Sequence, residues 1–333
     1  MSRSVRRIIV ILAVAALQLT AFAQATPTPG PITAGSAAQV QFSADILVEG
    51  IINDLAFSPD GSLLFTAGQD TSVRVWSLED GEQVAEAYEH FSFVKGVAFT
   101  ESVMATTSWD QSLIFWSLAE NGDLTAESTI GGLGAVVEQL AVSPDGSRVA
   151  FGVGDGRVRI ADASTGAVQY ELTVNSLRVT ALAYSPDGTQ VAAAGGFPAT
   201  GALIWDVATG AQTAEIAHPG VVTALAYSPD GAYLAAGGED GGVTLWQDGA
   251  QIAALDLEDW VTDLAFTPDG AVLAATRQDG IMTLWDVTDP TAPEMAVALV
   301  AADGAINALA VSPDGAQIAT ASEDGGVRLW QVK

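Results

Sequence analysis

Residues 222–231 read Val-Thr-Ala-Leu-Ala-Tyr-Ser-Pro-Asp-Gly, and this stretch decides the fold because its last four residues recur along the chain. Successive copies lie about 42 residues apart, and one interval is about twice as long. That long interval contains a degenerate copy, since Val97-Ala98-Phe99-Thr100 repeats the apolar lead-in without the Pro-Asp-Gly. The chain therefore contains seven repeats. The intact copies begin at Ser58, Ser143, Ser185, Ser228 and Ser312, with a Thr variant at Thr267.

Each repeat has the pattern of several short antiparallel strands. In the quoted repeat, the apolar run 222–228 meets a turn in which Pro presets φ and Gly accepts a positive φ, and 233–236 is apolar again. A second turn at 239–242 precedes a strand ending in Trp246, and 251–255 fits a fourth strand. One such sheet cannot cover both of its apolar faces, so neighbouring repeats must stack in a ring. The sequence predicts an all-β, seven-bladed β-propeller of four-stranded antiparallel blades.

The second turn of each repeat carries a further pattern, because an Asp there is usually followed six residues later by a Trp. The pairs are Asp70 and Trp76, Asp110 and Trp116, Asp240 and Trp246, Asp279 and Trp285, and Asp324 and Trp330. On these residues the chain resembles the WD-repeat β-propellers, whose dipeptide appears as Trp205-Asp206 and Trp285-Asp286. The third repeat departs from the pattern with Asp155 and Ala161, and the fourth has no turn Asp.

The resemblance also implies a structural network of a His, a hydroxyl, the turn Asp and the Trp. Only the second repeat matches all four, with His90, Ser108, Asp110 and Trp116. The fifth repeat offers a partial version with His218, Asp240 and Trp246, and Gly238 stands where the hydroxyl would be. A His that donates to a turn carboxylate satisfies buried polar groups. We expect both histidines to be structural.

The ring must be closed, because an open ring would expose a strand edge. The last repeat stops after its third strand at Trp330–Lys333, and the segment 40–44 before the first repeat is apolar enough to be the missing strand. The resemblance implies that this N-terminal strand completes the last blade.

The N-terminus has the composition of an export signal. Three Arg residues precede a short apolar run, and Ala21-Phe22-Ala23 fits a signal-peptidase site. We predict a signal peptide over 1–23, a Pro/Thr/Gly-rich linker over 24–37, and the propeller over 38–333, which makes the chain an exported member of prokaryotic type. The expected location is extracellular, periplasmic or envelope-associated, and an uncleaved anchor is the alternative. The chain has no Cys, so disulfides and lipid-modified Cys are excluded.

The acidic balance limits the partners. The formal charge of −28 argues against binding to nucleic acid or anionic lipid. Acidic turns such as 323–325 supply oxygen ligands, but none has the spacing of a loop that wraps a calcium ion. We expect no metal, no cofactor, no membrane insertion after signal cleavage, and a monomer.

Candidate binding residues come from the loops before each first strand and between the second and third strands, which the resemblance places on one face of the ring. Phe93, Arg178 and Trp260 are the unusual residues before a first strand, and Trp109 and Phe91 lie near Phe93 in the second repeat. Exposed aromatic and Arg side chains anchor protein interfaces. We predict that these five residues bind a protein or peptide, and packing between loops is the alternative.

The sequence supplies no catalytic constellation, and we expect a non-catalytic scaffold. The strongest enzyme alternative is a carbohydrate-active hydrolase that uses Asp54 and Asp263, at equivalent positions of two first strands, with Glu138 one residue out of phase. A small-ligand sensor that uses the central channel is the other alternative.

Overall fold

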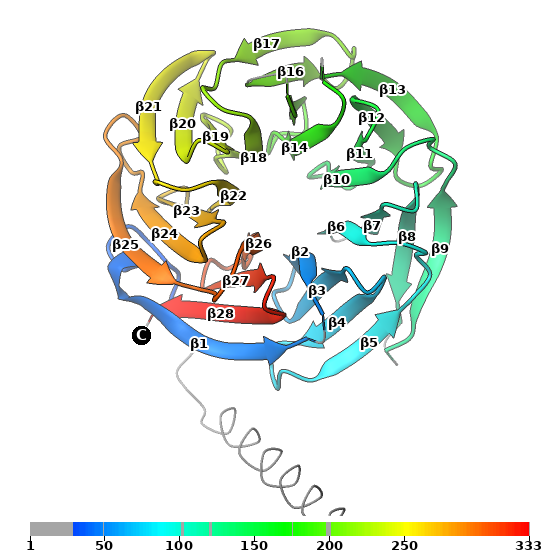
Figure 1. Cartoon of the computed structure of the whole chain (residues 1–333), viewed down its shortest axis with the longest axis horizontal. Coiled ribbons are helices and arrows are strands. Elements are labelled where there is room, and N and C mark those ends of the chain that lie inside the picture. Colours follow the sequence, from blue (N-terminus) through cyan, green and yellow to red (C-terminus); the bar gives the residue numbers. More distant parts are fainter. Residues whose placement is uncertain are drawn as a thin grey trace, which may run out of the picture.

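The computed structural model of this chain describes residues 29–48, 50–100, 103–119, 122–174, 176–197 and 201–332. These residues form seven four-stranded sheets, which are the blades of a ring. Figure 1 shows the first strand of each blade nearest the central axis and the fourth strand at the periphery. Within every sheet, each strand pairs antiparallel with the next one along the chain, except where the ring is closed. The predicted fold class is confirmed.

The blades follow one another in sequence order, with the last blade shared between the two ends of the described chain. Blades 1 to 4 consist of β2 (Ile52–Phe57), β3 (Leu63–Gly68), β4 (Val73–Ser77) and β5 (Gln83–Ala87); β6 (Val94–Phe99), β7 (Met104–Ser108), β8 (Leu113–Leu118) and β9 (Leu124–Ile130); β10 (Val137–Val142), β11 (Arg148–Val153), β12 (Arg157–Asp162) and β13 (Val168–Thr173); and β14 (Val179–Tyr184), β15 (Gln190–Gly195), β16 (Ala202–Asp206) and β17 (Gln212–Ile216). Blades 5 to 7 consist of β18 (Val222–Tyr227), β19 (Leu234–Gly238), β20 (Gly242–Gln247) and β21 (Ala250–Asp256); β22 (Val261–Phe266), β23 (Val272–Arg277), β24 (Ile281–Asp286) and β25 (Glu294–Val300); and β26 (Ile306–Val311), β27 (Gln317–Ser322), β28 (Gly326–Val332) and β1 (Val40–Leu47).

The Ser-Pro-Asp-Gly turn joins the first and second strands of a blade by a repeated set of hydrogen bonds. In blade 5, the Ser228 hydroxyl donates to Asp230 Oδ1 at 2.6 Å and accepts from the Tyr233 amide at 2.9 Å. Gly231 has a φ of +72° and donates its N–H to the Ser228 carbonyl at 2.8 Å. Ser228, Asp230 and Gly231 therefore hold the turn by hydrogen bonds among themselves and to the start of the next strand.

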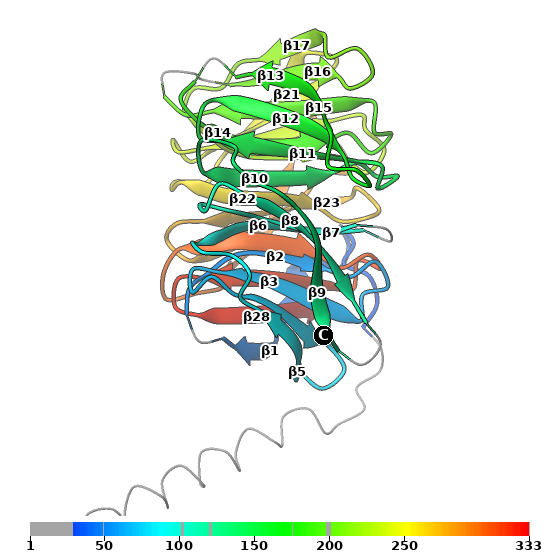
Figure 2. The same ribbon diagram turned by 90° about the vertical axis from the view of Figure 1, so that its right-hand side faces the viewer.

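The hydrophobic core lies between the blades rather than inside any one of them. Each core cluster joins neighbouring blades; one packs Val158 and Ile160 of blade 3 against Val191 and Trp205 of blade 4. Since a blade has two apolar faces, each face is buried only when the next blade stacks on it. Figure 2 shows this stack from the side.

The ring closes as the sequence predicts, because β1 pairs with β28 from Val40 opposite Val332 to Leu47 opposite Gly326. The packed domain starts earlier than residue 38, however. Ile32 and Ala37, inside the predicted linker, are fully buried in the cluster of blades 6 and 7, and the Ile32 amide donates to the Gly315 carbonyl at 2.7 Å. A short 3-10 helix, η1 (Ala37–Gln39), leads from this contact into β1.

The predicted signal peptide over 1–23 lies outside the described residues. Among the residues that are described, none belongs to a helix long and apolar enough to cross a membrane.

Candidate functional site

One hydrogen bond recurs in all seven blades and defines the rim of the ring on the loop face. The residue after each second strand donates its N–H to the carbonyl of the residue before the first strand, at 2.8–3.2 Å. Each blade thus presents one pair of rim residues at the channel mouth. In blade order the pairs are Ile51 and Gln69, Phe93 and Trp109, Val136 and Gly154, Arg178 and Gly196, Val221 and Glu239, Trp260 and Gln278, and Ala305 and Glu323.

Blade 2 places two of the predicted binding residues in one rim pair. The rings of Phe93 and Trp109 lie 5.2 Å apart between centroids at an angle of 36°, and each side chain is more than a third exposed. The Lys95 ammonium lies 5.7 Å from the centre of the Trp109 ring, a cation–π distance. Phe91 is 92% exposed, and its backbone N–H donates to Asp110 Oδ2 at 2.9 Å. Blade 2 therefore presents a supported aromatic surface.

The other predicted binding residues lie on blades 4 and 6. Arg178 is exposed at the rim of blade 4, and Trp260 is 46% exposed at the rim of blade 6. Two more exposed apolar side chains flank Arg178 and its rim partner Gly196, namely Leu177 and Phe197, which are 80% and 82% exposed. The sequence reasoning missed this pair, although Phe197 lies in the turn that departs from the repeat pattern. Exposed apolar anchors therefore stand on blades 2, 4 and 6.

The histidine network of blade 2 supports this face from below. The Trp116 indole donates to Thr106 Oγ1 at 2.8 Å, the Thr106 hydroxyl lies 2.8 Å from His90 Nε2, and His90 Nδ1 lies 2.9 Å from Asp110 Oδ2. The hydroxyl between His90 and Trp116 thus belongs to Thr106 rather than to Ser108. Ser108 lies at the end of β7, where its Oγ donates to the Ser92 carbonyl at 3.2 Å and accepts from the Asp110 amide.

Burial lowers the pKa of His90, although the neighbouring Asp110 opposes this shift. The imidazole is therefore neutral at physiological pH, with one nitrogen free to donate to the carboxylate and the other to accept from Thr106. The Asp110 carboxylate also accepts from the Ser112 hydroxyl at 2.5 Å. Every polar atom of the His90 ring is satisfied within the fold, so the residue positions a turn rather than performs chemistry.

Side chains of the inner strands form a second set of contacts, which join five of the seven neighbouring blade pairs within the described residues. Asn53 donates to the Val94 carbonyl at 2.7 Å, and Asn307 donates to the Ile52 carbonyl at 2.8 Å. The Thr180 hydroxyl of blade 4 donates to the Val222 carbonyl of blade 5, and the Thr223 hydroxyl of blade 5 donates to the Val261 carbonyl of blade 6. These residues occupy the second position of their first strands. The polar lining of the axis therefore holds the ring together.

Asp54 and Asp263 belong to this set of contacts. Asp54 accepts the N–H groups of Leu55 at 2.8 Å and of Val97, in the next blade, at 2.8 Å. Asp263 likewise accepts from Leu264 and, across to blade 7, from Leu309, both at 2.8 Å. Both oxygens of each carboxylate are occupied by backbone donors. A carboxylate in this position joins neighbouring blades through its backbone hydrogen bonds.

Burial sets the protonation of these two carboxyls. It raises the pKa of Asp54 to about 7, against the lowering effect of the Val97 N–H, and the charge of Asp263 adds to the rise. Burial also raises the pKa of Asp263 to about 6, against the lowering effects of the Leu309 and Leu264 N–H groups. Lys95 lines the same cavity, and burial lowers its pKa while Glu138 and Asp54 oppose the shift.

The cavity on the axis has a volume of about 180 Å³ and is lined by first-strand residues of all seven blades. Small-molecule sites are commonly clefts of about 300–1,000 Å³. Within the described residues, no group of three His, Cys, Asp or Glu side chains is placed to hold a metal ion.

Comparison with protein families agrees with this geometry. The profile described as "WD domain, G-beta repeat" matches residues 46–77, 210–247, 251–286 and 297–331. The chain belongs to the WD40-repeat β-propeller family. A second WD40 profile, that of the anaphase-promoting complex subunit 4 WD40 domain, matches residues 116–187. WD40 propellers are generally non-catalytic and commonly bind proteins.

The chain is also similar to parts of longer WD-repeat proteins. Transducin beta-like protein 3 of Rattus norvegicus is 38% identical over 73 residues, which are 21% of this chain and 9% of that protein. Protein HIR1 of Yarrowia lipolytica is 36% identical over 111 residues, which are 30% of this chain and 10% of that protein. A Periodic tryptophan protein 2 homolog of Neurospora crassa is 35% identical over 74 residues, 22% of this chain and 8% of that protein. The matched regions thus span about a tenth of these relatives.

In four blades of this WD40 propeller, an arginine instead of a histidine is the charged partner of the turn Asp. Arg74, Arg159 and Arg328 pair with the turn Asp four residues earlier, at 2.5, 3.1 and 2.7 Å. In blade 6, Arg277 reaches Asp279 from the other side of the turn. Sequence reasoning missed these pairs, although the spacing of Asp and Arg by four residues was visible in three repeats. The turn Asp is thus paired with a histidine in blade 2 and with an arginine in blades 1, 3, 6 and 7.

Proposed function

We propose that this protein is an exported, non-catalytic WD40 scaffold that binds a protein or peptide on its loop face. The observation that carries the proposal is the set of exposed apolar anchors on blades 2, 4 and 6 around the channel mouth. They are Phe91, Phe93, Trp109, Leu177, Phe197 and Trp260, with Arg178 among them. Aromatic and Arg side chains dominate the binding energy of interfaces, and exposed apolar side chains grouped around one opening are typical of a binding surface.

The mechanism is rigid display. Rim residues are held by the recurrent backbone hydrogen bond, and blade 2 is stiffened further by the buried network of His90, Thr106 and Trp116. Because the anchors are ordered before a partner arrives, little conformational entropy is lost on binding. Lys95 and Arg178 add positive charge at the mouth of an otherwise acidic protein. This charge favours a partner segment that combines apolar side chains with a carboxylate.

Export is the sequence-based part of this proposal. It is supported by the basic, then apolar, then small-residue order of residues 1–23. N-terminal sequencing of the protein recovered outside the cytoplasm is expected to begin at Gln24.

We do not extend the proposal to catalysis or to a sensor in the channel. Asp54 and Asp263 each bond one oxygen to the next blade and the other to their own strand, and the cavity beside them has a volume of only about 180 Å³.

The test is a peptide-display selection followed by affinity measurement on three purified proteins. The rim variant carries Phe93→Ala, Trp109→Ala and Trp260→Ala. The control variant carries Val168→Ala, Met295→Ala and Val300→Ala, which remove similarly exposed side chains from the outer strands β13 and β25. Selected peptides should bind wild type and control equally and the rim variant about 30-fold or more weakly, since interface anchors are each worth more than about 1 kcal/mol. Equal binding to all three proteins of matched thermal stability would refute the loop-face assignment.

A further inference from the structure

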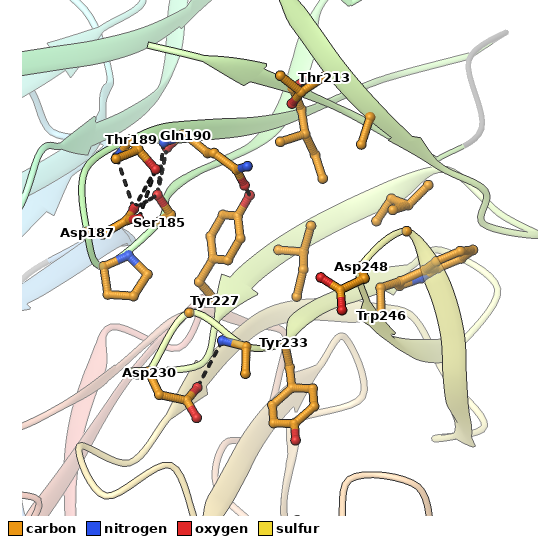
Figure 3. Close-up of a pocket in the computed structure, with 18 residues that line it drawn as sticks. Ser185, Asp187, Thr189, Gln190, Thr213, Tyr227, Asp230, Tyr233, Trp246 and Asp248 are labelled. Carbon is orange, nitrogen blue, oxygen red and sulfur yellow. Dashed lines mark hydrogen bonds between the residues drawn. The ribbon is translucent and has the colours of Figure 1, made fainter. Parts of the chain in front are cut away.

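A second pocket lies between blades 4 and 5 on the opposite end of the ring from the rim. Its volume is about 480 Å³, well above that of the cavity on the axis. The walls come from the Ser-Pro-Asp-Gly turns of both blades, from β17 of blade 4, and from the hairpin after Trp246 of blade 5 (Figure 3). These turns connect strands one to two and three to four, whereas the rim is made by the other two connections.

The first contribution to the pocket is the small side chain of Ala214 in blade 4; Ala also stands at the equivalent positions of blades 1 and 5, whereas blade 3 has a tyrosine there. In blade 3, Tyr170 lies opposite Ile160, extends over the next blade and donates its hydroxyl to the Ala208 carbonyl at 2.6 Å. The contact is close, since a Cβ added to Gly210 would lie 2.8 Å from the Tyr170 ring. At the same position of blade 4, opposite Ile204, stands Ala214. The space that Tyr170 fills between blades 3 and 4 is therefore open between blades 4 and 5.

The second cause is a shortened hairpin in blade 5. In blade 4, five residues separate β16 from β17, and among them Val207 is buried and donates its N–H to the Thr189 carbonyl. In blade 5, only Asp248 and Gly249 separate β20 from β21, with φ values of +50° and +77° that suit a two-residue turn. No apolar residue follows the strand to cover the groove. The side chain that takes its place at the edge of the pocket is the Asp248 carboxylate.

The lining combines aromatic side chains with acidic ones. Tyr227, Tyr233 and Trp246 supply ring surface, and among the described residues no Lys, Arg or His lines the pocket. Figure 3 shows Asp248 beside Trp246 and the Tyr227 ring extending towards Gln190. Within the described part of the chain, the Asp248 side chain makes no hydrogen bond or ion pair with the protein.

Asp230 provides a second carboxylate with an unused oxygen. Its Oδ1 accepts from the Ser228 hydroxyl at 2.6 Å and from the Ala232 amide at 3.0 Å, and Oδ2 has no partner within the described residues. By contrast, both oxygens of Asp187, also in the lining, are bonded to side chains of its own turn. Asp230 and Asp248 thus supply the carboxylate oxygens of the pocket that have no hydrogen-bond partner within the described residues.

We propose that this pocket binds an alkylammonium group. Aromatic faces attract such a cation through their quadrupole, carboxylates attract it by charge, and a pocket without a basic residue has no competing internal partner. A neutral ligand of the same shape gains only the apolar contact. The group comes either as a free small amine or as a lysine side chain of a peptide, and both sources present the same chemistry to the site.

The first experiment compares three probes by isothermal titration calorimetry on the intact protein. Choline represents a free ammonium, 3,3-dimethyl-1-butanol is its neutral isostere, and the peptide Gly-Lys-Gly represents a lysine side chain. Choline or the peptide should bind at least about tenfold more tightly than the neutral isostere, because the charge is the recognised feature. Binding of the peptide without choline assigns a peptide source, and the reverse assigns a free amine. Equal binding of the neutral isostere, or no binding of either cation at about 20 mM, overturns the proposal.

Variants then place the binding in this pocket. Ala214→Tyr introduces the side chain that blade 3 has at this position and should abolish binding. Asp248→Asn keeps the shape and the turn, since Asn also tolerates positive φ, and should weaken the cation about three- to tenfold. Asp80→Asn changes the same charge in an exposed hairpin of blade 1 and should leave affinity unchanged. If Asp248→Asn and Asp80→Asn behave alike, the site lies elsewhere, even should Ala214→Tyr fail to fold.

Discussion

Blades 2 and 5 both carry a buried histidine before their first strand, yet only one of them completes the network. In blade 2, Thr106 links His90 to Trp116. In blade 5, the equivalent residue of the second strand is Ala236, which pairs with Thr244 as Thr106 pairs with Ile114. The His218 Nε2 atom is consequently buried without a partner among the described residues, and the Trp246 indole donates to Thr244 instead. The lack of one hydroxyl thus changes the hydrogen bonding of His218 and Trp246, while the four strands of the blade are kept.

The comparison extends to how each blade is attached. Asp54 of blade 1 accepts the Val97 N–H of blade 2, whereas blade 4 has Ala181 at the position of Asp54 and offers blade 5 no carboxylate. Blade 4 also meets blade 5 through a cluster rich in alanine, beside the pocket described above. The contact between blades 1 and 2 thus includes a carboxylate, whereas that between blades 4 and 5 relies on the Thr180 hydroxyl and on packing.

The largest effect is expected from removing the hydroxyl that distinguishes the blades. Thr106→Val keeps the side-chain shape but leaves the Trp116 indole N–H and His90 Nε2 buried and unpaired. Each unsatisfied buried group costs about 1–3 kcal/mol, so the free energy of unfolding should fall by about 3–4 kcal/mol in urea titrations. Thr107→Val is the matched control, since the Thr107 hydroxyl is buried and unpartnered within the described residues and its removal should cost nothing. Equal costs for the two variants would show that the network contributes no stability.

A smaller effect is expected from the pH dependence of the Asp54 contact between blades 1 and 2. The pKa of Asp54 is raised from 3.8 to about 7, so the folded protein favours the protonated carboxyl; that stability is complete below 3.8 and is lost as the pH rises through about 7. Between pH 5 and 8, the stability of wild type relative to Asp54→Asn should therefore fall by about 3 kcal/mol.

The range starts at pH 5 because the isoelectric point is near 4.1. Comparison with a variant cancels the general repulsion of an acidic protein at high pH. Asp60→Asn, in an exposed turn of the same blade, is the control, because hydrogen bonds from Ser58 and Ser62 lower the Asp60 pKa and its contribution is constant above pH 5. If the stability of wild type relative to Asp54→Asn rises with pH instead of falling, folding lowers the pKa of Asp54 rather than raising it.

The smallest effect is expected from completing the network of blade 5. Ala236→Thr supplies the hydroxyl that His218 Nε2 lacks and should raise the free energy of unfolding by about 1 kcal/mol, the net value of one hydrogen bond. Ala235→Thr, one residue away on the opposite face of β19, should destabilise the protein because that site is fully buried among apolar residues. No gain for Ala236→Thr, or an equal loss for both variants, would indicate that His218 is not oriented as His90 is.

The fold was predictable because repetition multiplies weak local signals. The Ser-Pro-Asp-Gly turn and the terminal Trp predicted seven blades, and the resemblance to WD-repeat propellers implied the pairing of β1 with β28. The side-chain hydrogen-bond partners inside a blade were harder to predict from the sequence. Ser108 lies two residues before Asp110 in the sequence, which made it the expected hydroxyl. The strand register instead places Thr106 where the His90 and Trp116 side chains meet.

The pocket between blades 4 and 5 was missed for a different reason. It results from a small side chain, Ala214, at a position where blade 3 has Tyr170, combined with a hairpin at Asp248 too short to carry an apolar residue. Such a difference becomes visible only when the equivalent positions of several repeats are aligned on known strands. The sequence did contain the signal, since the turn after Trp246 is the shortest after any third strand of the described blades.

The pairing of β1 with β28 also orders events in time. During synthesis, strands of blades 1 to 6 can pair with neighbours made within about 40 residues, but β1 must wait until β28 has been made. Until then the two blade faces beside the gap and the edge of β1 stay uncovered. The finished ring is thus a late, long-range event, and a chain that crosses a membrane before folding would complete it only on the far side.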